Sequence, residues 1–114
     1  MKTFKHAFKG IIHVFKNERN FKIHILATIA VIIAGFVFKI SPTEWLAVII
    51  VIASVTALEM LNSAIEYISD FVSPDYNEKI KIIKDVSAGA VLISATAALL
   101  TACIIFIPKF FAII

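Results

Sequence analysis

Apolar positions divide the chain into one amphipathic segment followed by three nearly continuous hydrophobic runs. Across residues 3–17, phenylalanine, isoleucine and alanine recur with the 3.6-residue period of an α-helix, and lysines with one histidine fill most of the other positions. A basic helix with a phenylalanine-rich face is typical of a segment that lies in a membrane interface on anionic headgroups. The alternative is that this apolar face packs against protein.

Each hydrophobic run is long enough to cross a membrane, for which a helix needs about 17–25 residues. The runs cover residues 23–40, 45–65 and 86–107. Trp45 begins the second run as an interfacial anchor, and Ser41 or Thr43 in the short connector before it can cap the next helix. The pattern therefore predicts an all-α membrane protein with three transmembrane helices, preceded by an amphipathic cytoplasmic segment over residues 1–22.

Composition supports this class of protein. The chain has 114 residues, of which 61% are hydrophobic and 17% charged, and its mean hydropathy is +0.97. A soluble domain is typically about 45–50% apolar. The length allows a single domain over residues 1–114, the hydrophobicity excludes intrinsic disorder, and the lone cysteine excludes a disulfide scaffold.

Positive charge is concentrated in two segments that three spans would place on the same side of the membrane. Residues 1–22 hold six of the eleven lysines and arginines and residues 66–85 hold three, whereas Lys39 and Lys109 fall on the opposite side. Cytoplasmic segments of membrane proteins are enriched in Lys and Arg, so we expect the first group to face the cytoplasm.

One carboxylate, Glu59, lies within a predicted span, where a charged group is costly and marks a functional candidate. Polar residues continue from it at offsets of three, seven and eleven, which places four side chains on one face of the helix: Glu59, Asn62, Glu66 and Asp70. Glu18 and Asn20 precede the first span and come to the same membrane depth as Glu66. The alternative is a polar stripe that only holds helices together.

Two carboxylates at that depth, Glu18 and Glu66, could hold a divalent cation whose shell is completed by substrate phosphates, as Mg²⁺ prefers. Lys79, Lys81 and Lys84 supply positive charge nearby, although each alone fits an ordinary interfacial lysine. The chain has no Walker A motif, no dinucleotide fingerprint, no HExxH and no CxxC. A polar strip at the lipid–water boundary suits a reaction that joins a lipid headgroup to a water-soluble reagent.

The sequence from Glu59 to Glu66, EMLNSAIE, resembles the E-x-L-N-[ST]-A-[IV]-E motif of the prokaryotic diacylglycerol kinase and undecaprenol kinase family. Asp70 follows at the spacing of the family. Two further blocks, 17–21 (NERNF) and 84–92 (KDVSAGAVL), are also similar to it. The resemblance covers essentially the whole chain, in order and with matching spacings.

The resemblance implies a homotrimeric bundle with composite active sites in the plasma membrane of a bacterium. It implies ATP- and Mg²⁺-dependent phosphorylation of a lipid alcohol at the cytoplasmic interface, with no nucleic acid partner. Glu59 resembles the catalytic base, Asn62 belongs to the same catalytic strip, and Glu18 and Glu66 resemble the metal-binding pair. Positions that the family uses for the nucleotide are His6, Glu18, Glu66, Asp70, Asp75, Tyr76, Asn77, Lys84 and Asp85. Those implied for the lipid substrate are Phe15, Asn20, Glu59 and Ala88.

The choice of lipid depends on a short block. Residues 18–24 are similar to the branch that favours undecaprenol, whereas the diacylglycerol branch tends to carry an acidic residue where His24 stands. His6 occupies a position where the family often has tyrosine, and Asn77-Glu78 replaces a commoner pair that contains histidine. These differences leave open whether ATP or GTP is the preferred phosphate donor. We therefore expect an undecaprenol kinase. Within the family, the alternative is a diacylglycerol kinase. Outside it, the alternative is a non-enzymatic three-span assembly protein. A transporter has less support, because three spans lack an inverted repeat.

Overall fold

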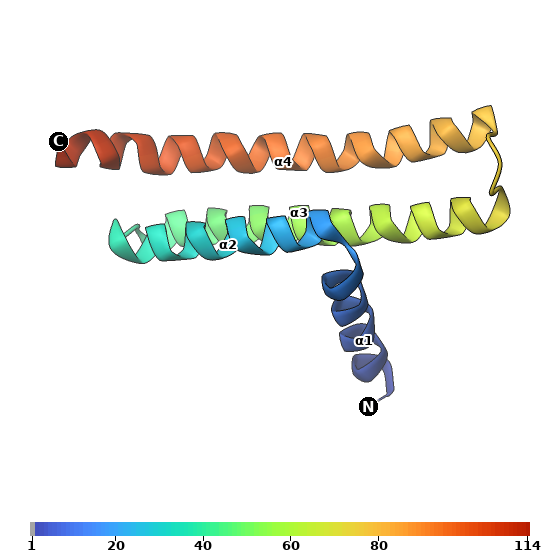
Figure 1. Ribbon diagram of the computed structural model, residues 1–114. Helices are drawn as coiled ribbons and strands as arrows, with labels where there is room; N and C mark the ends of the chain where they lie inside the picture. The colour runs from blue at the N-terminus through green and yellow to red at the C-terminus, as the bar shows by residue number, and fades with distance from the viewer. Residues whose placement is uncertain (1) are drawn as a thin grey trace.

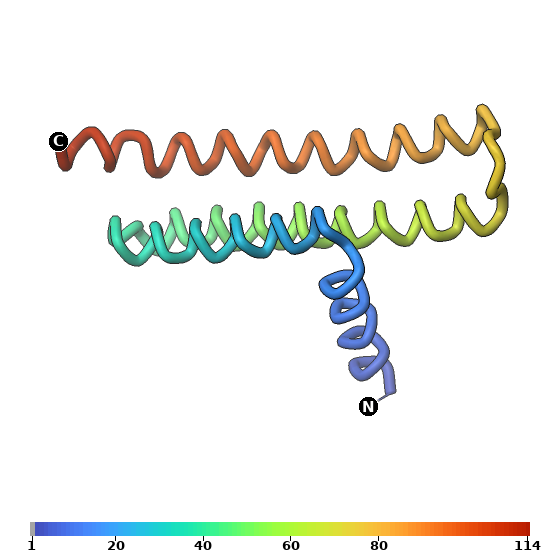
Figure 2. Tube along the Cα trace, in the orientation of Figure 1, coloured from blue at the N-terminus to red at the C-terminus, as the bar shows by residue number. Residues whose placement is uncertain are grey.

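The computed structural model describes residues 2–114, and all of its regular structure is helical. Helix α1 spans Lys2–Asn17, α2 spans Arg19–Val37, α3 spans Pro42–Val72 and α4 spans Glu78–Ile113. Figure 1 shows α2, α3 and α4 lying alongside one another, while α1 projects away from them at a steep angle. The chain trace in Figure 2 shows that α3 and α4 are antiparallel and joined at one end by a short loop.

The predicted all-α membrane fold is confirmed. Helices α2, α3 and α4 are long and apolar enough to cross a membrane, with mean hydropathies of 1.9, 2.0 and 2.5 in their most apolar stretches. Helix α1 is the predicted amphipathic segment: its phenylalanines and isoleucines are exposed, and Val14 is its one buried residue. Most large apolar side chains of the three long helices are also exposed in the single chain.

The starts of α3 and α4 follow local capping chemistry rather than the limits of the apolar runs. The Ser41 hydroxyl accepts a hydrogen bond from the Glu44 backbone at 3.2 Å, and the Glu44 carboxylate accepts one from the Ser41 backbone at 2.9 Å. This capping box, with Pro42 at the first helical position, begins α3. Lys39 takes a φ of 53° at the preceding turn. Asn77 caps α4 by accepting from two backbone N–H groups.

The long helices extend beyond the predicted spans on the side of the α3–α4 loop. Helix α3 has 31 residues and α4 has 36, so the last turns of α3 and the first turns of α4 continue past the apolar stretches. The break between the first two helices falls at Glu18, because α2 begins at Arg19 rather than at the start of the apolar run. These extensions carry the polar residues 66–85 on ordered helical backbone.

The opposite end of the bundle contains the buried core. Ile40, Val48 and Ile105 form its centre, and Trp45 packs partly buried against them. Lys109 of α4 pairs with Glu44 of α3 at 3.1 Å, which ties the two helices together at this end. The candidate site lies away from this core, on the side of the α3–α4 loop.

Candidate functional site

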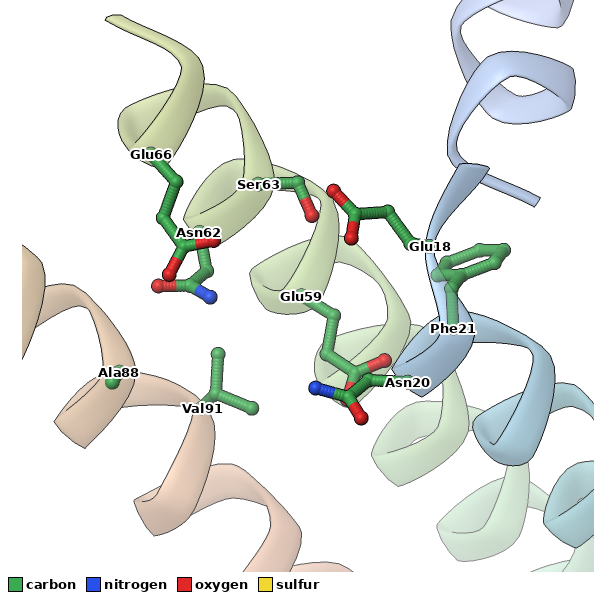
Figure 3. Close-up of a pocket in the computed structure, with 9 residues that line it drawn as sticks. All are labelled: Glu18, Asn20, Phe21, Glu59, Asn62, Ser63, Glu66, Ala88 and Val91. Carbon is green, nitrogen blue, oxygen red and sulfur yellow. The ribbon is translucent and has the colours of Figure 1, made fainter. Parts of the chain in front are cut away.

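A polar pocket lies where the start of α2 meets the middle of α3 and the part of α4 that contains Ala88 and Val91 (Figure 3). Its volume is about 230 Å³. Helix α3 supplies most of the polar wall, α4 supplies two apolar side chains, and the α2 end supplies the rest. The lining residues are Glu18, Asn20, Phe21, Glu59, Asn62, Ser63, Glu66, Ala88 and Val91.

The structure brings together the residues that the sequence placed at one membrane depth. Glu59, Asn62 and Glu66 share one face of α3, as their spacing predicts, and all three line the pocket. Glu18 and Asn20 meet them from a segment about forty residues earlier in the chain. Figure 3 shows Glu18 on the connection between α1 and α2 and Glu66 on α3. The polar stripe is therefore the wall of a cavity.

Glu59 carries an unsatisfied oxygen. Its Oε2 is buried and has no hydrogen-bond partner within the described chain. A buried acceptor without a partner costs free energy comparable to a lost hydrogen bond, and a buried charge without one costs more. Glu59, which lines the pocket, thus has one buried carboxylate oxygen that no donor of the described chain satisfies.

Asn62 is fixed by a bond to the facing helix. The Ser87 hydroxyl of α4 donates to Asn62 Oδ1 at 2.7 Å, and Ser87 is only 8% exposed. The sequence did not single out three residues that line the pocket, Phe21, Ser63 and Val91, nor Ser87, which binds Asn62. Ser87 lies in the block of residues 84–92, where the third apolar run begins, but only the rotation of α4 against α3 shows that it faces the polar stripe.

Glu18 is held by an aromatic residue that the sequence did not single out. The Tyr67 hydroxyl donates to Glu18 Oε1 at 2.7 Å across 49 residues of sequence. This hydrogen bond is the main reason that the pKa of Tyr67 is raised above its usual value, so the phenol stays protonated and donates. The only local signal for Tyr67 is its position next to Glu66, at the end of the predicted stripe.

A second pocket, of about 340 Å³, surrounds the α3–α4 loop. Lys84 Nζ donates to Asp70 Oδ1 across the two helices at 2.5 Å, and this contact raises the pKa of Lys84 above its usual value. Asp85 lies apart and pairs with Lys81 on its own helix at 2.7 Å. The pocket is lined by Asp70, Ser73, Pro74, Asp75, Tyr76, Asn77, Ile80, Lys81 and Lys84, which include five predicted nucleotide positions.

The remaining predicted positions are divided between the pocket and α1. Ala88 lines the first pocket together with Asn20 and Glu59. His6 and Phe15 lie exposed on α1 and line neither of the two polar pockets of the single chain. No group of three or more His, Cys, Asp or Glu side chains between residues 2 and 114 is arranged to hold a metal ion. A metal bound here would need oxygens from its substrate in addition to Glu18 and Glu66.

Long apolar helices that carry a polar, carboxylate-lined pocket are the features of a small helical membrane protein with a candidate site between its helices. Residues 5–106 match the sequence profile of the prokaryotic diacylglycerol kinases. The chain belongs to this family, which confirms the resemblance noted in the sequence and makes the protein a membrane-bound lipid kinase that uses ATP.

Similar proteins are named for one of two lipid substrates, undecaprenol or diacylglycerol. Undecaprenol kinase of Bacillus subtilis is 38% identical over 108 residues, which cover 95% of this chain and 88% of that protein. Diacylglycerol kinase of Synechocystis is 35% identical over 107 residues, which cover 93% of this chain and 61% of that protein. Diacylglycerol kinase of Escherichia coli K12 is 28% identical over 105 residues, which cover 92% of this chain and 86% of that protein.

Proposed function

We propose that the protein is an undecaprenol kinase, which transfers the γ-phosphate of ATP to the hydroxyl of undecaprenol at the cytoplasmic face of the membrane. The buried, unpaired oxygen of Glu59 in a carboxylate-lined pocket carries the proposal, because it offers an acceptor to the proton of a lipid alcohol. The undecaprenol kinase of Bacillus subtilis, 38% identical over most of both chains, supports the choice of lipid.

Glu59 acts as the general base in this proposal. Its carboxylate takes the proton of the lipid hydroxyl while the hydroxyl oxygen bonds to the γ-phosphorus and the bond to the β-phosphate oxygen breaks, which leaves ADP. Asn62, one turn further along α3 and fixed by Ser87, orients the reacting groups. Asn20 and Ala88 border the space where the lipid headgroup would lie.

The phosphates of ATP belong at the outer part of the same pocket. Glu18 and Glu66 would hold Mg²⁺ there, because two carboxylates with phosphate oxygens are the ligands that this ion prefers. When bound, the ion neutralises charge on the transferring phosphoryl group. The pocket at the α3–α4 loop, which contains Lys84 and follows directly along α3, suits the rest of the nucleotide. Asp70, Asp75, Tyr76 and Asn77 would contact it there.

We further propose that the protein works as a homotrimer with composite sites. The exposed apolar faces of α2, α3 and α4 offer surface for helices of other copies as well as for lipid. His6, Phe15 and Asp85 line neither polar pocket of the single chain, so their expected roles toward nucleotide and lipid call for a site completed by a neighbouring protomer. The single domain of residues 1–114 would be the repeating unit.

The orientation of the protein follows from charge. Nine of its eleven lysines and arginines lie in residues 1–22 and 66–85, on the side of the polar pockets. The positive-inside rule therefore supports an orientation with both pockets at the cytoplasmic face of the plasma membrane, where ATP is available. Helix α1, with its lysines and exposed phenylalanines, would lie on that surface.

Diacylglycerol kinase is the second candidate, since the relatives from Synechocystis and Escherichia coli carry that name. The hypothesis of a non-enzymatic three-span assembly protein has less support. It expects the stripe residues to pair with one another or with Ser and Thr, which holds for Asn62 and Ser87 but not for Glu59 Oε2.

A competition assay distinguishes the two lipids. Purified protein in detergent or lipid is given labelled ATP, Mg²⁺ and equal amounts of undecaprenol and diacylglycerol. We expect phosphate mainly on undecaprenol. If the product is mainly phosphatidic acid, the substrate is diacylglycerol rather than undecaprenol. If neither lipid is phosphorylated, the proposed function is wrong.

A further inference from the structure

The Glu18 side chain is placed by an interaction outside its own helix. Glu18 is the N-cap residue of α2, with a φ of −108° and a ψ of 115°, yet its side chain makes no capping hydrogen bond. The side chains that usually accept from the first backbone N–H groups of a helix are the shorter ones of Ser, Thr, Asp and Asn. Here Oε1 accepts from the Tyr67 hydroxyl on α3 instead. The carboxylate is therefore held away from its own helix end, toward α3.

Tyr67 is itself held in place by α1. The His13 ring meets the Tyr67 ring edge-on, with centroids 5.9 Å apart and an interplanar angle of 80°. Asn17 donates to the His13 backbone carbonyl at 2.8 Å, which fixes the last turn of α1 beside this contact. Three helices thus meet at one phenol, whose hydroxyl reaches the pocket carboxylate.

We propose that Tyr67 is a positioning residue: it holds Oε1 of Glu18 so that Oε2 is presented to the metal and phosphates of the bound nucleotide. The proposal rests on the proposed role of Glu18 as a metal ligand. A free glutamate side chain samples several rotamers, and a hydrogen bond to one oxygen selects the geometry of the other. Residues that orient a ligand in this way commonly change metal affinity about 10–100-fold when they are replaced.

A purely structural role for Tyr67 predicts something different. Tyr67 is 44% exposed, and its ring keeps its contact with His13 when only the hydroxyl is removed. Tyr67→Phe therefore preserves the packing between α1 and α3 and removes only the bond to Glu18. If Tyr67 served packing alone, this variant would leave metal binding unchanged.

The test compares Tyr67→Phe with Glu18→Gln and with a control, Phe71→Leu, which changes an exposed aromatic side chain one turn further along α3. Binding of Mn²⁺ in the presence of ATP is measured by electron paramagnetic resonance on the full-length protein in detergent. The Mg²⁺ dependence of lipid phosphorylation is measured in parallel, and circular dichroism verifies helix content.

We expect Tyr67→Phe to weaken Mn²⁺–ATP binding about 10-fold, the lower end of the range for such residues because the phenol is partly exposed. The KM for the lipid stays unchanged, Glu18→Gln loses more affinity, and Phe71→Leu behaves as wild type. Wild-type metal affinity in Tyr67→Phe with a strong defect in Glu18→Gln would overturn the positioning role alone. Wild-type affinity in both variants would overturn the proposed metal role of Glu18 and this inference with it.

Discussion

Replacing Ser87 by alanine tests whether the contact between α3 and α4 organises the site. The variant removes the hydroxyl that donates to Asn62 Oδ1 at 2.7 Å. A neutral hydrogen bond contributes about 0.5–1.5 kcal/mol net, and bonds between membrane helices average about 0.6 kcal/mol. Ser87 is 8% exposed, whereas the freed Asn62 oxygen lines a pocket that admits water. We therefore expect the free energy of unfolding to fall by about 1 kcal/mol, which is about five-fold in an equilibrium constant.

The hydrogen bond from Ser87 also stabilises one orientation of the Asn62 amide by about the same free energy. Without Ser87, the amide rotates among its other rotamers, and the fraction in the productive orientation falls by up to about five-fold. The turnover number should fall by about that factor while the KM for ATP changes little. Lipid phosphorylation measures the first quantity, and denaturant titration in detergent, followed by circular dichroism, measures the stability.

Ser94→Ala is the matched control on the same face of α4. Its hydroxyl donates to the backbone carbonyl of Val91 in its own helix at 3.2 Å and makes no bond to α3. Its removal should change neither stability nor turnover by more than a fraction of the Ser87→Ala effect. Equal losses in the two variants would refute the argument that the Ser87–Asn62 bond organises the site.

Two further predictions concern the other end of the bundle. Gly35→Ala places a Cβ 2.5 Å from the Trp45 ring, so the indole must move; overpacking costs about 1–3 kcal/mol, and about 1 kcal/mol of helix propensity offsets part of it. The emission of this single tryptophan should shift, whereas Gly10→Ala, with open space around it, should leave it unchanged. Glu44→Gln should lower the melting temperature at neutral pH, because the backbone N–H of the N-cap serine and then Lys109 hold the pKa of Glu44 below its usual value. A carboxyl group whose pKa is lowered by folding stabilises the protein at any pH above its unfolded-state pKa. This stability is lost as the pH falls through the folded-state pKa, so the melting temperatures of wild type and Glu44→Gln should converge on acidification.

Local sequence patterns were sufficient to predict the helices and the stripe on α3. The offsets between Glu59, Asn62 and Glu66 place them on one face of any α-helix, whatever surrounds it. The convergence of Glu18 on the same pocket also followed, because two antiparallel spans return to the same membrane depth. Hydropathy did not give the start of α2, since Arg19 is helical four residues before the apolar run begins.

Contacts between helices could not be predicted in the same way. The bonds from Ser87 to Asn62 and from Tyr67 to Glu18 depend on the rotation of each helix about its own axis, and periodicity fixes only which residues share a face. The approach of Trp45 to Gly35 is likewise set by the turn between α2 and α3. These contacts orient Asn62 and Glu18, which the sequence singled out as candidates, through Ser87 and Tyr67, which it did not.

The most direct test of the account is the turnover of Glu59→Gln. Glutamine keeps the shape of the side chain and removes the carboxylate that would accept the lipid proton. We predict normal folding, assembly and ATP binding with lipid phosphorylation reduced about 10²–10⁴-fold, the usual contribution of a general base. Glu44→Gln, a matched change at the opposite end of α3, should keep wild-type turnover at a temperature where both variants are folded. Near wild-type phosphorylation by Glu59→Gln would contradict the central claim that Glu59 is the base.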